Sequence, residues 1–203
     1  MTQTATRRRK VLAILAAGAV VGVGGAYTLA AWNDSEFLTA DLASGSFNLE
    51  GSLDGATYSE HDTAPAAAEA FTLSTSNMVP EQVVYDSFFV RLDAATTVSG
   101  TLAQPAAATA TGATDDYSYV VAALDSGAAC DAAGIAGGTV IGQADALDGA
   151  NASTASVALA PGADTAAGAP VELCIQVTAA ADLAEAATAT VTWEFEATSD
   201  DAS

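Results

Sequence analysis

The alternation of apolar and polar residues near the end of the chain is the feature that most constrains its fold. In the stretch TVTWEFEAT (residues 190–198), every second residue is apolar, namely Val191, Trp193, Phe195 and Ala197. The residues between them are Thr or Glu. A period of two is typical of a strand with one buried face and one solvated face. The stretch therefore predicts a half-buried β-strand.

Similar patterns recur along the chain and are separated by Gly, Pro and Asp-Gly turns. Further strands are predicted at residues 46–49, 70–76, 83–92, 97–102, 117–124, 139–143, 153–159 and 171–179. About nine strands at this spacing favour an all-β fold, a single antiparallel jelly-roll or β-sandwich domain. The Ala-rich stretch 105–116 is expected to be a flexible surface loop, and 179–187 a helical turn or two that links the last strands.

The two ends of the chain differ in charge. Arg7, Arg8, Arg9 and Lys10 open the sequence, whereas all 25 acidic residues lie at Asp34 or beyond. A basic start followed by the apolar and Gly-rich stretch 11–25 is typical of an export signal. We therefore expect a cleavable signal helix at residues 1–30, the β domain at 31–198, and an acidic tail at 199–203.

Small side chains at Thr28 and Ala30 suit the pockets of a signal peptidase and place the cut before Ala31. An uncleaved membrane anchor is the alternative, although its glycines would each weaken a helix by roughly 1 kcal/mol. The paired arginines also allow a twin-arginine export route, so the route stays open. Either route leads to a secreted protein of the extracellular matrix or cell surface, with the membrane contacted only through the uncleaved signal.

Removal of residues 1–30 would leave Arg91 as the single Lys or Arg against 25 acidic residues, a formal charge of 1 − 25 = −24. This charge excludes nucleic acid as a partner. It is typical of a solvated acidic coat, and Ca²⁺ binding on the same surface is the alternative.

Cys130 and Cys174 are the two cysteines of the chain. In an exported protein such a pair predicts a disulfide, stabilising by roughly 3.5–4.5 kcal/mol through loop-closure entropy. Alternation places Leu173, Ile175 and Val177 on one face of their strand, so Cys174 is expected on the opposite, outer face.

The residues needed for common catalytic sites are scarce. One histidine, His61, cannot supply a His-rich zinc site by itself, and no Gly-rich nucleotide loop follows a strand. We therefore expect no catalytic residues, no metal ligands and no cofactor. Two Asn-X-Ser triplets, at Asn33 and Asn151, match the glycosylation formula and stay unassigned.

Four stretches carry a resemblance to a known family. They are the leader RRRKVLAILAAGAVVGVGGAYTLAAWNDSE from residue 7, LASGSFNLEGS (42–52), NMVPEQVVYDSFFVRL (77–92) and TWEFEATSD (192–200). The leader resembles signal peptides processed by the SipW-type signal peptidase. Together the stretches resemble the TasA/camelysin family of exported biofilm-matrix proteins, in the Ala- and Asp-rich form of actinobacteria.

This resemblance implies a jelly-roll subunit whose freed N-terminal segment, residues 31–49, adds as a strand to the next subunit. The partners implied are a dedicated signal peptidase and further copies of the chain in a fibre. We expect Trp32, Asn33, Asp34, Phe37 and Leu42 to take part in this assembly, with Phe47 and Leu49 as further apolar candidates. Main-chain hydrogen bonds and alternate side chains would hold such a strand.

Two alternatives remain at this point. The N-terminal segment can instead fold onto its own subunit, which we expect for residues 46–49 and leave open for residues 32–37. The protein can also be a monomeric secreted module that binds carbohydrate or calcium.

Overall fold

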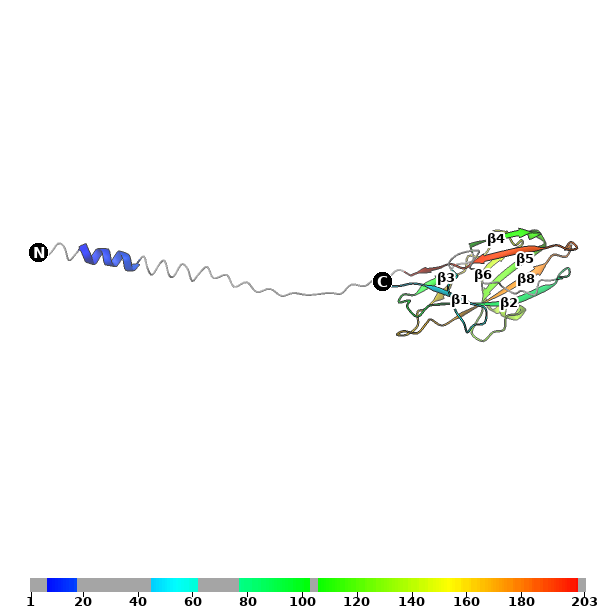
Figure 1. Ribbon diagram of the computed structural model, residues 1–203, viewed down its shortest axis with the longest axis horizontal. Helices are drawn as coiled ribbons and strands as arrows, with labels where there is room; N and C mark the ends of the chain where they lie inside the picture. Colours follow the sequence, from blue (N-terminus) through cyan, green and yellow to red (C-terminus); the bar gives the residue numbers. More distant parts are fainter. Residues whose placement is uncertain (1–6, 18–44, 62–76, 103–105, 201–203) are drawn as a thin grey trace. The chain divides into compact units, whose positions relative to one another are not determined.

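A computed structural model describes residues 7–17, 45–61, 77–102 and 106–200 of the chain (Figure 1). The chain divides into two units, Met1–Ala43 and Ser44–Ser203. In the first unit, residues 7–17 are helical. Val11, Leu12, Ile14 and Leu15 are exposed on that helix. The β-strands all belong to the second unit, described below.

The largest sheet has five antiparallel strands in the order β1-β2-β8-β5-β6 (Figure 1). Their bounds are β1 Leu49–Ser52, β2 Val83–Leu92, β8 Val171–Ala179, β5 Tyr117–Ala123 and β6 Thr139–Ala144. Strands β2 and β8 are the long central pair, and β1 and β6 form the edges. This confirms the all-β prediction.

Two smaller antiparallel sheets complete the domain. One contains β10 (Ala197–Ser199), β3 (Gly100–Leu102) and β7 (Val157–Leu159), and the other pairs β4 (Ala106–Gly112) with β9 (Ala189–Glu194). Leu102 of β3 pairs with Ala197 of β10. Ala106 of β4 lies four residues after Leu102, and it pairs with Glu194 of β9, which lies three residues before Ala197. The register differs by one residue between these two pairs, and it shifts again within β4 between Ala106 and Thr109.

The core lies between the inner face of the five-stranded sheet and the apolar face of β9 and the residues after it. Leu173, Ile175 and Val177 of β8 are almost fully buried in one cluster. Two aromatic contacts join the sheets: Tyr119 meets Trp193 edge-on at 5.6 Å between ring centroids, and Phe88 stacks on Phe195 at 5.5 Å. Three of these rings are partly buried and lie against a core whose fully buried members are mostly aliphatic, such as Leu92, Leu102 and Ile141.

Strands β2 and β8 have the predicted bounds. The predicted strand at 190–198 is two strands, β9 and β10, with Phe195 and Glu196 between them. The alternation continues through the break, because Val191, Trp193, Phe195 and Ala197 all pack against the core. The prediction for residues 70–76 lies outside the described residues.

The prediction of a flexible loop at residues 105–116 was wrong. Residues 106–112 form β4, and Thr114–Asp116 form a 3-10 turn, η1. Thr109 and Thr111 are exposed while Ala110 between them packs against the core, so the period of two is present. It was hidden because alanine is a weak marker of a buried face in a chain where alanine is everywhere.

Two helix predictions were also wrong. In the predicted stretch 179–187, Ala179 ends β8 and residues 180–187 form two turns instead of a helix, closed by hydrogen bonds from Leu183 N to Ala180 O and from Ala187 N to Ala184 O. A short helix, α2 (Ala132–Gly137), begins where none was expected. Asp131 caps it by accepting hydrogen bonds from the backbone N–H groups of Ala133 and Gly134, both at 2.9 Å.

Candidate functional site

The residues predicted to act in export and assembly lie outside the described residues. These are Thr28, Ala30 and Ala31 at the expected cut, and Trp32, Asn33, Asp34, Phe37 and Leu42 after it. All eight belong to the unit Met1–Ala43, whereas the compact β unit begins at Ser44. The expected donor segment 31–49 is therefore divided between two units.

The part of that segment after Ser44 folds into its own domain. Thr97 N donates to Ser46 O at 3.1 Å, and Asp93 N donates to Asn48 O at 3.1 Å. Strand β1 then pairs with β2, starting with Leu49 opposite Leu92. The regular strand begins three residues later than predicted, and residues 46–49 contact residues 92–97 of the same chain, as expected for a segment that folds onto its own subunit.

Phe47 anchors this entry into the domain. Its ring packs against Gly100, where an added Cβ would lie 2.5 Å from a ring carbon, and it also contacts the core cluster. Asn48 N donates to the hydroxyl of Thr96 at 2.9 Å, and that hydroxyl donates to Asp93 Oδ1 at 2.7 Å. The Thr96 hydrogen bond holds the pKa of Asp93 below its ordinary value. Residues 46–49 are therefore held in the domain by backbone and side-chain hydrogen bonds.

The predicted disulfide joins Cys130 to Cys174, with their Cα atoms 5.2 Å apart. Cys174 pairs with Ser87 on β2 and Ala122 on β5, so it lies on the outer face of the large sheet, opposite Leu173 and Ile175. It is nevertheless fully buried. The loop at residues 124–138 covers it, and an added Cβ at Gly138 of this loop would lie 3.4 Å from the Ala122 side chain.

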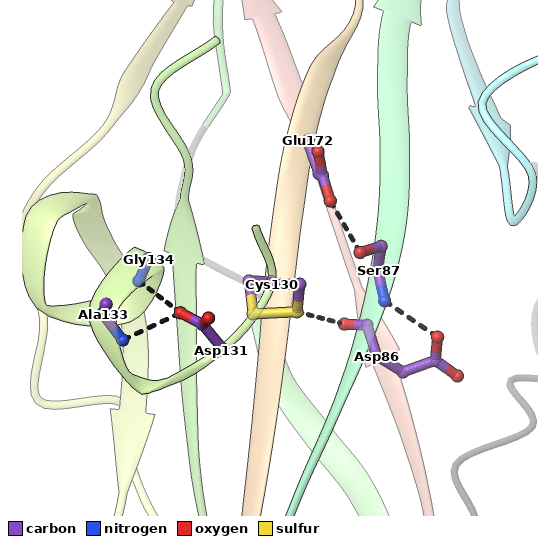
Figure 2. Close-up of a disulfide and its surroundings, with 8 residues drawn as sticks. Asp86, Ser87, Cys130, Asp131, Ala133, Gly134 and Glu172 are labelled. Atoms are coloured by element: carbon purple, nitrogen blue, oxygen red, sulfur yellow. Dashed lines mark hydrogen bonds between the residues drawn. A yellow bond between two sulfur atoms is a disulfide. The ribbon is translucent and has the colours of Figure 1, made fainter. Parts of the chain in front are cut away.

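Figure 2 shows the disulfide in front of β8, with the Asp131 cap on one side and Asp86 and Ser87 on the other. Cys130 Sγ lies 3.3 Å from the backbone oxygen of Asp86. Since a disulfide sulfur carries no proton, this is a close contact and not a donated hydrogen bond. Nearby, the Ser87 hydroxyl donates to Glu172 Oε1 at 2.7 Å. The arrangement fixes the loop covalently on the outer face of the sheet.

A second segment, residues 53–61, covers the outer face on the β1 side. Ser59 forms an antiparallel bridge with Gly51 through two hydrogen bonds of 2.9 and 3.0 Å. Arg91 contacts this segment: its guanidinium lies 3.8 Å from the centroid of the Tyr58 ring and donates to Glu50 Oε2 at 3.0 and 3.1 Å. The single cation outside the leader is therefore used within the domain.

The β6 edge is also covered, by residues 151–153, which we call the edge clip. Ala152 N donates to Gln143 O at 2.9 Å, and the Asn151 and Ser153 side chains bond to further backbone groups of β6. The Asn-X-Ser triplet at Asn151 thus has a structural role. Sequence reasoning missed it, because these hydrogen bonds join residues up to 13 positions apart.

Strand β4 differs from these covered edges. It pairs with β9 on one side, and among the described residues no other backbone hydrogen bond involves residues 106–112. Its sequence, AAATATG, carries no charge, proline or bulky residue. Uncharged edge strands of this kind are the usual templates for pairing with another chain.

Residues 7–17, 45–61, 77–102 and 106–200 contain neither a cluster of metal-ligating side chains nor a membrane-spanning helix. No group of three or more His, Cys, Asp or Glu side chains there is placed to hold a metal ion. Within these ranges, no helix is both long and apolar enough to cross a membrane. His61 Nε2 lies 3.1 Å from the Ser59 hydroxyl, next to the Gly51 bridge.

Comparison with known proteins adds no identification: no family model matches the chain, and no curated protein matches it.

Proposed function

We propose that the protein is an exported structural subunit of a biofilm matrix or cell-surface fibre, which assembles noncovalently by β-strand addition. In this proposal the antiparallel domain has a jelly-roll arrangement, as the resemblance to the TasA/camelysin family implies. The signal is removed before Ala31, and residues 31–44 of one copy add to a sheet of the next. The disulfide supports export, because such bonds persist in oxidising compartments.

One observation carries the proposal: the compact β unit begins at Ser44, and the apolar residues expected to donate precede it. Phe47 and Leu49 pack against the core of their own domain, so in this proposal the donated side chains are Trp32, Phe37 and Leu42. Full burial of three such side chains contributes roughly 1.5–3 kcal/mol each, on the order of 5–9 kcal/mol before association costs. A head-to-tail contact of this kind propagates as an open filament.

The acceptor in this proposal is β4. The edge clip and the Ser59 bridge cover the two edges of the large sheet, whereas β4 offers an uncharged edge. A neutral edge is favourable for a protein of formal charge −24 after processing, since it carries no carboxylate of its own that would repel an incoming strand. The rest of the surface still repels, so assembly is expected to need salt, calcium or low pH.

The test uses the processed protein at several salt concentrations and pH values, followed by light scattering and negative-stain microscopy. We expect fibres in salt, their loss on deletion of residues 31–39, and a strong reduction by Trp32→Ala combined with Phe37→Ala. Thr39→Ala is the matched control and should assemble as the wild type does. Monomers under every condition, with residues 31–42 intact, would contradict the proposal and favour a monomeric binding module.

A further inference from the structure

The edge clip forms hydrogen bonds with the backbone groups of β6 on its free edge, the side that does not pair with β5. Asn151 Oδ1 accepts from Gln143 N at 3.0 Å, and Asn151 Nδ2 donates to Ile141 O at 3.1 Å. The Ser153 hydroxyl donates to Val140 O at 2.6 Å, and Ala152 N donates to Gln143 O at 2.9 Å. Two side chains and one backbone amide therefore satisfy four backbone groups of β6.

The clip is itself held in this position. Ser153 N donates to Asn151 Oδ1 at 2.8 Å, so the same amide oxygen closes a turn within the clip and accepts from the strand. Ala155 N in turn donates to the Ser153 hydroxyl at 3.2 Å. The clip contacts β6 as a short mimic of a sixth strand, but its side-chain bonds cannot be extended by another strand.

Strand β6 would be an efficient pairing edge without this cover. Its sequence, TVIGQA, contains no charged residue and no proline, the two residue types that most often protect edge strands. Along its other edge, β6 is paired with β5 over Thr139–Ala144. An uncovered β6 would therefore present an ordered row of unpaired N–H and C=O groups.

We infer that the edge clip keeps β6 from pairing with the β6 strand of a second copy of this chain. A second copy is the fitting occupant because antiparallel pairing of a strand with itself brings the same uncharged residues together around a two-fold axis. The paired residues themselves carry no charge, and Asp145 lies just past the end of β6. This pairing would join the large sheets of two domains at an edge distinct from β4.

The same hydrogen bonds bear on whether the Asn151 triplet can carry a glycan in the folded protein. A glycan would be attached at Asn151 Nδ2, the atom that donates to Ile141 O. The Ser153 hydroxyl, which completes the triplet, is bonded to Val140 O. A glycan would replace one of the two Nδ2 hydrogens and place a sugar next to β6, so it would compete with the closed clip.

The test compares the full chain with Asn151→Ala/Ser153→Ala at neutral pH and about 0.15 M salt, where repulsion between the acidic surfaces is screened. Light scattering coupled to size exclusion measures mass, and hydrogen exchange measures protection of the Gln143 amide. We expect a dimer at tens of micromolar protein and, after dilution to a concentration at which the variant is monomeric, at least about tenfold faster exchange at Gln143. Thr154→Ala, which removes an exposed hydroxyl with no hydrogen bond to a described residue, should match the wild type in both measurements.

A second, milder variant keeps the test valid if the double alanine variant does not fold. Asn151→Asp keeps the side-chain volume but replaces the donor to Ile141 O with a carboxylate oxygen, so it should open the edge while leaving the β5–β6 pairing protected. An unchanged Gln143 amide in both variants at the dilution where they are monomeric would overturn the inference. Faster exchange at Gln143 without any change in mass would also overturn it, since an open edge would then have no effect on association.

Discussion

Two segments cover the outer face of the large sheet, and they are held there by different means. The loop at residues 124–138 is joined to β8 by the disulfide. It leads directly into β6, which is hydrogen-bonded to β5. Residues 53–61 are held by the Ser59 bridge, by the Arg91 contacts and by a turn at Asp54. One attachment is covalent, and the other consists of electrostatic contacts and hydrogen bonds.

The difference follows from what each segment can bury. The 124–138 loop is rich in Ala and Gly, and such small side chains gain little by packing on a sheet, so a covalent link compensates. Residues 53–61 contribute Tyr58 under Arg91 and place Gly55 against the Phe89 ring, where an added Cβ would lie 3.3 Å away. Aromatic contacts therefore take the place of a cross-link on this side, and the two regions should respond differently to substitution, salt and pH.

The largest effect is expected from loss of the disulfide. Cys130→Ala with Cys174→Ala should lower the free energy of unfolding by roughly 3.5–4.5 kcal/mol, through the entropy gained by the unfolded chain. Urea denaturation measures this loss, and the reduced wild type should show a similar one. Hydrogen exchange should accelerate at the Ile135 and Gly138 amides and stay unchanged at the Gly51–Ser59 bridge. A loss below about 1.5 kcal/mol would show that loop contacts, not the cross-link, hold the 124–138 loop.

A smaller effect is expected from Arg91→Ala. The Glu50 ion pair is partly exposed, with side-chain exposures of 28% and 19%, and contributes about 0.2–1 kcal/mol. The Tyr58 contact adds about 0.5–1 kcal/mol, so the free energy of unfolding should fall by about 1–2 kcal/mol.

Two controls separate the parts of the Arg91 effect. Glu50→Gln removes the ion pair and leaves the ring contact, whereas Arg91→Lys keeps the charge and loses the planar stacking. The ion-pair part should shrink as salt is added, because the pair is screened. If Arg91→Ala destabilised as much as loss of the disulfide, the contrast between the two segments would be wrong.

The parts of the fold that sequence predicted share a clear physical basis. Strands β2 and β8 carry β-branched and aromatic residues over nine or ten positions between turns, and their bounds were correct. The disulfide followed from the presence of two cysteines alone. Strand β4 was missed because Ala and Thr mark its faces weakly. Helix α2 was missed because an Ala- and Gly-rich run of six residues has no apolar period, and the Asp131 cap was its one signal.

The candidate site was less predictable. The role of Trp32, Phe37 and Leu42 as donor residues was inferred from a resemblance and stays a prediction. Phe47 packs against the core of its own chain, in the region where a strand was expected. The edge clip depends on a turn that returns residues 151–153 to β6, a long-range contact that no local pattern encodes. An Asn-X-Ser triplet directs attention to glycosylation, although here the same side chains serve the sheet.

The smallest effect is expected at the Asp54 turn, and it depends on pH. Asp54 Oδ1 accepts hydrogen bonds from Thr57 N at 2.7 Å, Ala56 N at 2.8 Å and the Ser52 hydroxyl at 2.9 Å. These bonds, the Thr57 amide foremost, hold the pKa of Asp54 well below its ordinary value. Because the folded-state pKa is the lower one, the unfolded chain takes up the proton first as pH falls.

The stability from Asp54 is therefore complete above the ordinary carboxyl pKa of about 3.9 and is lost as pH falls toward the folded-state value. Asn in its place keeps an acceptor oxygen but cannot ionise, so Asp54→Asn should have a Tm that falls less between pH 5 and pH 2 than that of the wild type. At pH 7 its Tm should be lower, by less than Arg91→Ala produces. Asp148→Asn, at an exposed carboxylate with no hydrogen bond to a described residue, is the matched control. Equal acid slopes for Asp54→Asn and the wild type would mean that the turn holds residues 53–61 without help from the charge, and the noncovalent attachment would then reduce to Tyr58, Arg91 and the Ser59 bridge.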